Sequence, residues 1–143
     1  MSDAPATFPA LSSTDRCPCH SGEVFGACCG RFLGGAADAP TAEQLMRSRY
    51  SAFVVGDVPY LLRSWHSSTR PPDLQLDPDL AWTGLEILNT TDGSPFHTEG
   101  TVEFRAHYTL DGRPAHQHEN SHFTRENGTW VYVEALPGGA TGR

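Results

Sequence analysis

The sequence of 143 residues contains no lysine, no long apolar run and no cysteine after residue 29. No stretch approaches the roughly 20 consecutive apolar residues that cross a bilayer, so a membrane-spanning helix is not expected. The residues before Arg16 include no basic side chain and no apolar core, which excludes a typical secretory signal. We therefore expect a cytoplasmic protein that does not insert into a membrane. All ten basic residues are arginine, and we attach no functional meaning to that bias.

Positive charge is also scarce, because 17 acidic residues oppose 10 basic residues and give a net charge of −7. Binding to a nucleic acid duplex requires clustered cations that displace counterions from the phosphates. The composition therefore argues against nucleic acid and leaves a protein or a small molecule as the expected partner. The length and the 38% of hydrophobic residues suit one small core.

The cysteines are confined to one short segment. They are Cys17, Cys19, Cys28 and Cys29, and their spacing provides two close pairs. A tetrahedral Zn²⁺ bound by four thiolates uses such pairs and keeps no open position for water. The segment is therefore predicted to hold one structural zinc ion. Two disulfides between the pairs are an alternative in an oxidising compartment, and His20 could replace one thiolate.

Composition divides the chain into segments. Residues 1–15 contain several serines and prolines and are predicted to form a disordered lead. The cysteine knuckle is assigned to residues 16–33, and the glycine- and alanine-rich residues 34–40 are predicted to be a flexible linker. The main domain then covers residues 41–137, and residues 138–143 are expected to form a flexible tail.

The first half of the main domain is predicted to be helical. Thr41 begins a capping-box pattern, which predicts a helix over residues 42–55. The apolar stripe of this helix also carries Arg49, and a guanidinium in that position needs a partner. Asp57 is a suitable cap for a second short helix that reaches Trp65.

The second half changes to the period of β-strands. Residues 101–110 alternate apolar and polar side chains, which is typical of a half-buried strand, and residues 81–89 form an earlier candidate. Residues 111–112 are Asp-Gly and residues 127–128 are Asn-Gly, both strong signals for tight hairpins. The pattern predicts an α+β domain in which helices pack on an antiparallel sheet.

The hairpin loops determine which residues face each other across the strands. A two-residue first loop places Glu119 opposite Phe104, among core residues, and the second loop then places Glu134 opposite Ser121. An isolated buried charge is costly, so these groups predict either an ion pair between Arg49 and Glu119 or a polar ligand pocket. The pocket would be lined by Arg49, Tyr50, Trp65, His66, Glu119, Ser121 and Glu134.

The same register puts most of the histidines on the other face of the sheet. That face would carry Glu103, Arg105, His107, His116, His118 and His122. Alternating polar residues are typical of a solvated sheet surface. A second metal site is the alternative interpretation.

Particular stretches also carry a resemblance to known families. Residues 17–22, which read Cys-Pro-Cys-His-Ser-Gly, and residues 25–30 resemble the SEC-C motif, the small zinc knuckle at the C-terminus of the SecA translocation motor. From about residue 16 to residue 136 the chain resembles the YchJ-like family, through residues 45–53, 65–66, 101–104, 119–123 and 128–133. This resemblance implies a zinc knuckle followed by a domain similar to nuclear transport factor 2 (NTF2), with helices on a strongly curved sheet around a cone-shaped cavity.

The chain departs from the family pattern at two places. His20 stands where the SEC-C motif usually has glycine, and Glu23 stands near a usual basic residue, so the partners of the basic SecA surface are not expected here. Some members also carry a second cysteine cluster after the last strand, which this sequence lacks. Sheets of this superfold often dimerise through the outer face, so a homodimer is possible.

The resemblance implies no established reaction, and two functions stay open. The first is a cytoplasmic zinc-binding accessory protein whose knuckle or polar cavity binds a partner or ligand. The second is an enzyme with isomerase- or dehydratase-like acid–base chemistry in the cavity. In that case Glu119 or Glu134 would be the base, His66 would act as acid or orienting donor, and Arg49 would hold an anionic group of the substrate.

Overall fold

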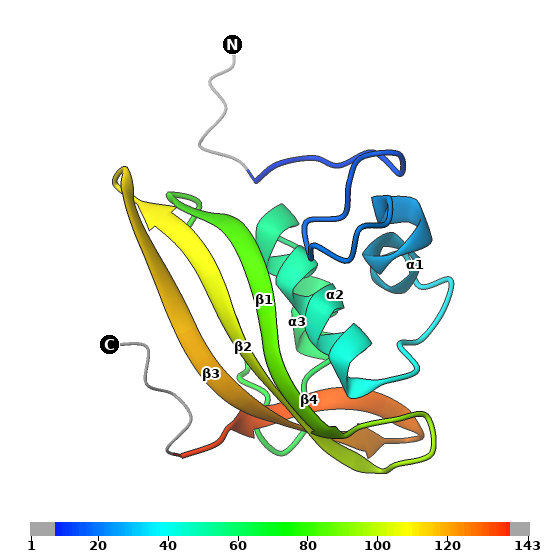
Figure 1. Ribbon diagram of the computed structural model, residues 1–143. Helices are drawn as coiled ribbons and strands as arrows, with labels where there is room; N and C mark the ends of the chain where they lie inside the picture. The colour runs from blue at the N-terminus through cyan, green and yellow to red at the C-terminus, as the bar shows by residue number, and fades with distance from the viewer. Residues whose placement is uncertain (1–7, 138–143) are drawn as a thin grey trace.

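The computed structural model describes residues 8–137 (Figure 1). Residues 1–7 of the predicted lead and residues 138–143 of the predicted tail lie outside the described residues. The fold is α+β, as predicted. The longest helix lies between a curved antiparallel sheet on one side and the cysteine segment on the other (Figure 1).

Four helical segments precede the sheet. They are the 3₁₀ turn η1 (Phe25–Ala27) and the helices α1 (Cys29–Leu33), α2 (Ala42–Val55) and α3 (Val58–Arg63). The helix predicted over residues 42–55 is confirmed, and its cap is the predicted one, because Oγ1 of Thr41 accepts from the backbone N–H of Gln44 at 3.1 Å. Gly56 ends it in the left-handed conformation at φ 75°.

Helix α3 is shorter than predicted. Asp57 caps it by accepting from the backbone N–H of Tyr60 at 3.1 Å, but the helix ends at Arg63 and does not reach Trp65. Trp65 instead forms an isolated parallel bridge with Tyr132. The helix ends early because the backbone carbonyl of Ser64 and the backbone N–H of His66 are hydrogen-bonded to Tyr132 on β4. The local sequence pattern does not reveal this tertiary contact.

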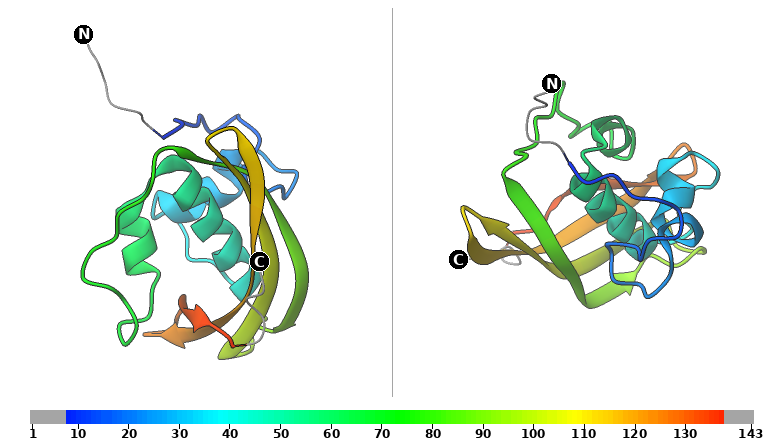
Figure 2. Two further views of the ribbon diagram at one scale, coloured as in Figure 1. Left: turned by 90° about the vertical axis from the view of Figure 1, so that its left-hand side faces the viewer. Right: turned by 90° about the horizontal axis from the view of Figure 1, so that it is seen from above.

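The sheet has four antiparallel strands in the order β1-β2-β3-β4. Their bounds are β1 (Leu80–Asp92), β2 (Glu99–Leu110), β3 (Arg113–Glu126) and β4 (Thr129–Ala135). Both predicted hairpins are present, and the non-glycine residues Asp111 and Asn127 adopt φ values of 54° and 55°, as tight two-residue turns require. Figure 2 shows the concave face of the sheet wrapped around α2 and α3, with β4 turning beneath them.

The register between β2 and β3 is the predicted one, with Phe104 opposite Glu119 and Val102 opposite Ser121. Between β3 and β4 the prediction is wrong after the first pairs. A bulge shifts the pairing, because Val133 of β4 is an extra residue between the pairs Phe123–Tyr132 and His122–Glu134. Ser121 therefore faces Ala135 rather than Glu134. A bulge adds one residue to a strand and reverses the face on which later residues lie, which leaves Glu134 exposed.

The cysteine knuckle is fastened to the main domain by arginine side chains. Nη1 of Arg47 on α2 donates to the carbonyl of Cys19 at 2.6 Å. Nη2 of Arg63 on α3 donates to the carbonyls of Phe32 and Leu33 at 3.1 and 3.2 Å. Because these carbonyls lie in the knuckle and at the end of α1, the two arginines hold this segment against α2 and α3.

Two segments that were predicted to be flexible make ordered contacts. In the lead, the carbonyls of Ser13 and Asp15 accept from the backbone N–H groups of Gly26 and Phe25. In the linker, Ala39 is buried, and the carbonyl of Pro40 accepts from Nε1 of Trp130 on β4. Backbone pairing with distant segments therefore orders residues whose composition alone indicated flexibility.

The core lies between α2 and the concave face of the sheet. Alternate residues of β2 point inward, so that Val102, Phe104 and Ala106 are buried, and Phe123 on β3 and Trp130 on β4 complete this layer. Within residues 8–137, no helix has the length and apolar character needed to cross a membrane.

Candidate metal centre and cavity

The sulfur atoms of Cys17, Cys19, Cys28 and Cys29 all lie within 4.8 Å of one another. The Sγ atoms of Cys19 and Cys28 are 3.7 Å apart, and those of Cys28 and Cys29 are 4.0 Å apart. Four thiolates bound to one ion at about 2.3 Å in a tetrahedron are separated by about 3.8 Å. The measured separations therefore fit four ligands of one metal ion.

The same distances exclude disulfides in this structure. A disulfide requires its two sulfur atoms at about 2.05 Å, whereas the Cys19 and Cys28 sulfurs are 3.7 Å apart. All four cysteines are free. Cys17, Cys19 and Cys29 are also buried, and a buried group of unpaired thiols is typical of a metal centre in a reducing compartment.

Backbone contacts shape the loop that carries the first cysteine pair. Arg16 and Val24 form an antiparallel bridge, and the N–H of Cys17 donates to the carbonyl of Glu23 at 2.9 Å. His20 turns the loop at φ 66°, a left-handed conformation that glycine adopts most easily. This conformation gives a physical reason for the glycine that the SEC-C motif usually has at this position.

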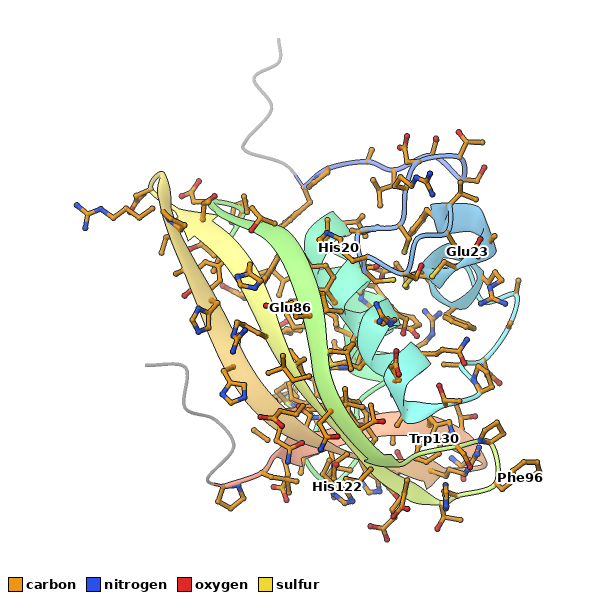
Figure 3. All side chains as sticks on the ribbon, viewed as in Figure 1. His20, Glu23, Glu86, Phe96, His122 and Trp130 are labelled. Atoms are coloured by element: carbon orange, nitrogen blue, oxygen red, sulfur yellow. The ribbon has the colours of Figure 1, made fainter. Side chains whose placement is uncertain are left out.

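The side chain of His20 lies against β1 rather than in the sulfur cluster. Its Cε1 atom is so close to Gly84 that a Cβ atom added there would approach it to 2.9 Å. The four cysteines form a ligand group without His20 in the described chain. Figure 3 shows the imidazole near β1, away from Glu23.

The hydroxyl groups of Ser21 and Ser51 contact the sulfur cluster. Oγ of Ser21 lies 3.1 Å from Sγ of Cys28, and Oγ of Ser51, on the buried side of α2, lies 3.6 Å from Sγ of Cys17. Hydrogen bonds of this kind stabilise thiolate ligands and orient them. The second hydroxyl also links the centre to the helix that lines the cavity described below.

Interactions among the thiols change their acidity. Hydrogen bonds from Cys19 and Cys29 lower the pKa of Cys17. The hydrogen bond with Cys17 in turn raises the pKa of Cys19 to about 11 and also raises the pKa of Cys29. Thiolates this close together repel one another, so a bound cation is needed for all four to ionise.

A separate cavity of about 160 Å³ lies between α2 and the concave face of the sheet. Five residues that the sequence predicted for a ligand pocket line it, namely Arg49, Tyr50, Trp65, Glu119 and Ser121. Burial raises the pKa of Tyr50, so its phenol stays neutral. The cavity therefore has one cationic and one carboxylate side chain in a largely aromatic wall.

Arg49 is only 4% exposed. Its Nη1 atom donates to the carbonyl of Leu61 at 2.8 Å and to Oγ of Ser64 at 2.7 Å. The centre of the guanidinium lies 5.0 Å from the ring centroid of Trp65 and 4.7 Å from that of Tyr132. Burial lowers the pKa of Arg49 to about 10, so the group is still charged at neutral pH.

The predicted ion pair between Arg49 and Glu119 is not formed in the described chain. Nη1 of Arg49 is occupied by the end of α3. The carboxylate of Glu119 accepts instead from Gln117 at 3.0 Å, from Ser121 at 2.6 Å and from the phenol of Tyr132 at 3.3 Å. Hydrogen bonds from its own strand and from β4 therefore satisfy the acid.

Replacement of Arg49 by methionine is expected to change the free energy of unfolding by less than about 1 kcal/mol. The pKa falls from 12.5 to about 10 on burial, which corresponds to roughly 3 kcal/mol against the charged form. This relief offsets the lost hydrogen bonds and ring contacts, at about 1 kcal/mol each. Urea unfolding of Arg49→Met, Glu119→Gln and the double variant measures this change, with Arg113→Met as an exposed control.

A structural ion pair predicts a different result from the same cycle. Removal of one partner would then cost about 3–5 kcal/mol, because the other charge would stay buried without compensation. The double variant would also show a strong coupling energy. Such values would contradict the contacts described for Arg49 and Glu119.

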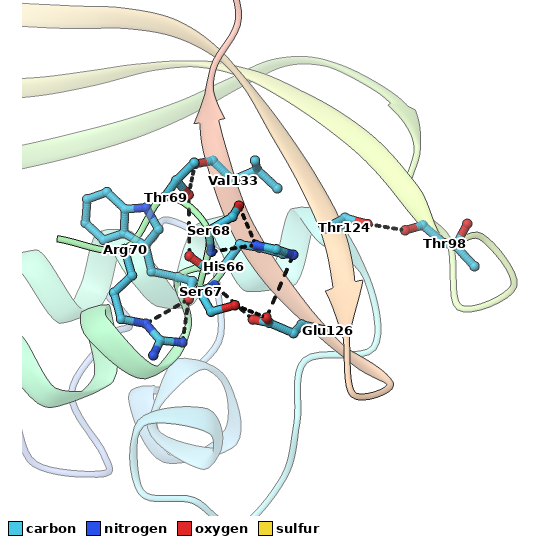
Figure 4. A network of polar contacts seen from close by, with 10 residues as sticks. His66, Ser67, Ser68, Thr69, Arg70, Thr98, Thr124, Glu126 and Val133 are labelled. Atoms are coloured by element: carbon cyan, nitrogen blue, oxygen red, sulfur yellow. Dashed lines mark hydrogen bonds and ion pairs between the residues drawn. The ribbon is translucent and has the colours of Figure 1, made fainter. Parts of the chain in front are cut away.

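His66 lies outside the cavity, in a polar network between the loop after α3 and the β3–β4 hairpin (Figure 4). Its Nδ1 atom accepts from the backbone N–H of Ser68 at 3.0 Å, and its Nε2 atom is 3.8 Å from Glu126. The N–H of Ser67 also donates to Glu126 at 3.1 Å. The prediction of His66 as a pocket residue is wrong, because the early end of α3 turns this side chain toward the hairpin.

Glu134 is the other predicted pocket residue that lies elsewhere. It is exposed and does not line the cavity, because the extra residue Val133 in β4 reverses its face. The sequence analysis in turn missed several cavity residues, namely Phe53, Trp82, Phe104, Gln117 and Tyr132. Phe104 and Gln117 share the inward face with Glu119, so the correct β2–β3 register already contained a signal for them.

The histidines on the outer face of the sheet pair with separate glutamates. Nε2 of His107 is 2.7 Å from Glu86, and Nε2 of His122 is 2.9 Å from Glu99. Nε2 of His118 is likewise 2.7 Å from Glu103. Within residues 8–137 the cysteines are the one group of three or more such side chains close enough to share an ion, so the alternative of a second metal site finds no support.

A larger groove of about 560 Å³ runs along the surface between α1, α3 and the β3–β4 hairpin. Its basic side chains already have partners, since Arg63 donates to the carbonyls of Phe32 and Leu33, and Nη2 of Arg70 donates to the carbonyl of Trp65 at 2.9 Å. The residues predicted for the ligand pocket do not line this groove. The smaller cavity is therefore the better candidate for a ligand site.

The fold and the cysteine centre together define an NTF2-like protein with an N-terminal SEC-C cluster that can bind a metal. Residues 41–135 match the family model described as YchJ, middle NTF2-like domain, and residues 14–31 match that of the SEC-C motif. A UPF0225 protein of Streptomyces coelicolor is 60% identical over 121 residues, which cover 85% of this chain and 94% of the relative. The chain belongs to this YchJ-like UPF0225 family.

Solved structures of two SEC-C motif containing proteins have the same fold. The solution structure of the protein from Rhodopseudomonas palustris superposes with a TM-score of 0.73 at 29% identity, over 84% of this chain and 96% of that protein. The crystal structure of the protein from Psychrobacter arcticus gives a TM-score of 0.70 at 25% identity, over 90% of this chain and 85% of that protein.

Proposed function

We propose that this chain is a cytoplasmic zinc-binding accessory protein. One structural Zn²⁺ is bound by Cys17, Cys19, Cys28 and Cys29, and the cavity between α2 and the sheet binds a small ligand or a segment of a partner. The observation that carries the proposal is the placement of all four sulfur atoms within 4.8 Å of one another. An all-sulfur tetrahedral site favours zinc, with iron as the competing ion.

The zinc ion is proposed to have a structural role. Four thiolates close its coordination shell, so no position is left for a reacting water. The knuckle has few apolar side chains, and metal binding supplies the free energy that orders such a segment. Through Ser51 and Arg47 the ordered knuckle is in contact with α2, the helix that carries Arg49 into the cavity.

The acid–base alternative is less well supported by the cavity. Of the three groups considered for it, Glu119 lines the cavity, while His66 and Glu134 lie outside. Glu119 already accepts hydrogen bonds from Gln117, Ser121 and Tyr132, so its oxygens are engaged by the protein itself. Binding without turnover is therefore the function that the geometry favours.

A native-mass measurement of the purified protein, with and without a strong chelator, tests the proposal. We expect one zinc ion per chain before chelation and a metal-free mass with four thiols afterwards. The same spectrum reports a retained ligand and the proposed alternative of a homodimer. A freshly purified protein that carries iron, or that contains two disulfides and no metal, would contradict the zinc assignment.

A further inference from the structure

We propose that the cavity binds a small zwitterion, with its carboxylate on Arg49 and its ammonium group among the aromatic rings beside Glu119. This inference rests on the proposed function only in taking the cavity as a ligand site, and it does not depend on the metal. The cavity contains one buried cation and one carboxylate that do not pair with each other, and a ligand with both charges complements them.

Arg49 has hydrogen-bond donors that the protein does not use. A guanidinium carries five N–H groups, and Nη1 uses its two on Leu61 and Ser64. Within the described residues, Nε and Nη2 of Arg49 make no hydrogen bond. Because Arg49 lines the cavity and is 4% exposed, the cavity is where an acceptor can reach them. A carboxylate matches that edge of the guanidinium with two parallel hydrogen bonds.

A second unpartnered donor lies beside the first. Nε1 of Trp65 is buried and has no hydrogen-bond partner in the described chain, although buried indole N–H groups usually have one. Trp65 lines the cavity, and its ring is in contact with the guanidinium of Arg49. Donors of two neighbouring cavity residues, Arg49 and Trp65, therefore lack an acceptor in the described chain.

The aromatic wall and Glu119 favour a cationic group in the same cavity. Trp82 packs edge-on against Tyr50 at a centroid distance of 5.9 Å and in a tilted arrangement against Phe53 at 6.0 Å, and all three residues line the cavity. Aromatic faces attract organic cations, and a carboxylate nearby strengthens that attraction. Glu119 is half-buried, lines the same cavity and accepts from the phenol of Tyr132, so its carboxylate supplies the negative charge on this wall.

Size restricts the ligand further. The cavity has about 160 Å³, whereas pockets for drug-sized ligands begin at about 300 Å³. A nucleotide or a sugar phosphate is too large. A free amino acid or a small betaine has the right charges and a suitable size.

The experiment uses the full-length, zinc-loaded protein and isothermal titration calorimetry. The probes are glycine betaine and the individual protein amino acids, with propionate and tetramethylammonium as ligands that carry only one of the two charges. We expect at least one zwitterion to bind at one site per chain, and to bind at least about tenfold more tightly than either single-charge probe. Absence of binding by every zwitterion at millimolar concentration, or equal affinity for propionate, would overturn the proposal.

Variants identify the site of binding. Arg49→Met and Glu119→Gln are each expected to weaken the zwitterion by about 30-fold or more, because each removes one buried charge contact. Glu134→Gln is the matched control, since this exposed carboxylate lies outside the cavity, and it should bind like the parent protein. Equal losses in all three variants would refute binding in the cavity.

Folding and zinc content are measured on the same samples. Thermal unfolding verifies that each variant is folded, and native mass reports its zinc count. A zinc count of one with no zwitterion binding would refute this inference alone. Zwitterion binding by a protein without zinc would refute the metal assignment and leave this inference standing.

Discussion

Replacement of Cys28 by alanine is expected to lower the affinity for zinc by roughly 100-fold or more, because one of four thiolates carries about a quarter of an apparent ~10–16 kcal/mol. Cys28 is the least buried of the four cysteines, so its truncation removes a ligand with little loss of packing. Competition with a chromophoric chelator measures the affinity. Amide hydrogen exchange should show loss of protection in residues 16–33, with the strands much less affected.

The matched control for this variant is Glu23→Gln. Glu23 lies in the same loop, but its backbone carbonyl, not its carboxylate, accepts from Cys17. It should leave both the zinc affinity and the exchange pattern unchanged. If Cys28→Ala keeps the full affinity, four-thiolate coordination is wrong.

Replacement of Trp130 by alanine is expected to destabilise the protein by about 3–5 kcal/mol, the usual cost of removing a fully buried aromatic side chain. Trp130 is 1% exposed, and its Nε1 atom donates to the carbonyl of Pro40 at 3.1 Å. The guanidinium of Arg125 lies 4.5 Å from its ring centroid. The side chain thus connects the segment between the knuckle and α2 to the sheet. Urea unfolding measures the resulting decrease in the free energy of unfolding.

Trp130→Phe separates packing from the hydrogen bond. It keeps most of the ring but leaves the Pro40 carbonyl without its donor, so a loss of about 1–2 kcal/mol is expected. A loss as large as that of Trp130→Ala would show that the contact with Pro40, rather than packing, dominates. A loss near zero for both variants would contradict the anchoring of residues 34–40 to the sheet.

The elements that the sequence predicted well depend on local chemistry. Thr41 and Gly56 delimit α2 because a hydroxyl cap and a left-handed glycine act on neighbouring backbone groups. Asp111 and Asn127 produce the two hairpins for the same reason, and the first hairpin loop determines the pairing of β2 with β3. Four cavity residues follow from this helix and this register, namely Arg49, Tyr50, Glu119 and Ser121.

The elements that were predicted wrongly depend on contacts between distant segments. The bulge beside Phe123 has no signal in the local alternation, yet it moves Glu134 to the outside. Pairing of Trp65 with β4 ends α3 early and places His66 at the hairpin. Arg49 was expected to pair with Glu119, but its guanidinium donates instead to the carbonyl of Leu61, in the last turn of α3.

The order of residues was enough to indicate a sulfur-bound metal, one long capped helix and a pair of tight hairpins, because each depends on groups that are close along the chain. Only the tertiary structure decided which charged side chains line the cavity and which are exposed to solvent. That outcome depends on strand curvature and on one extra residue in β4, and both arise from packing of the whole sheet around α2.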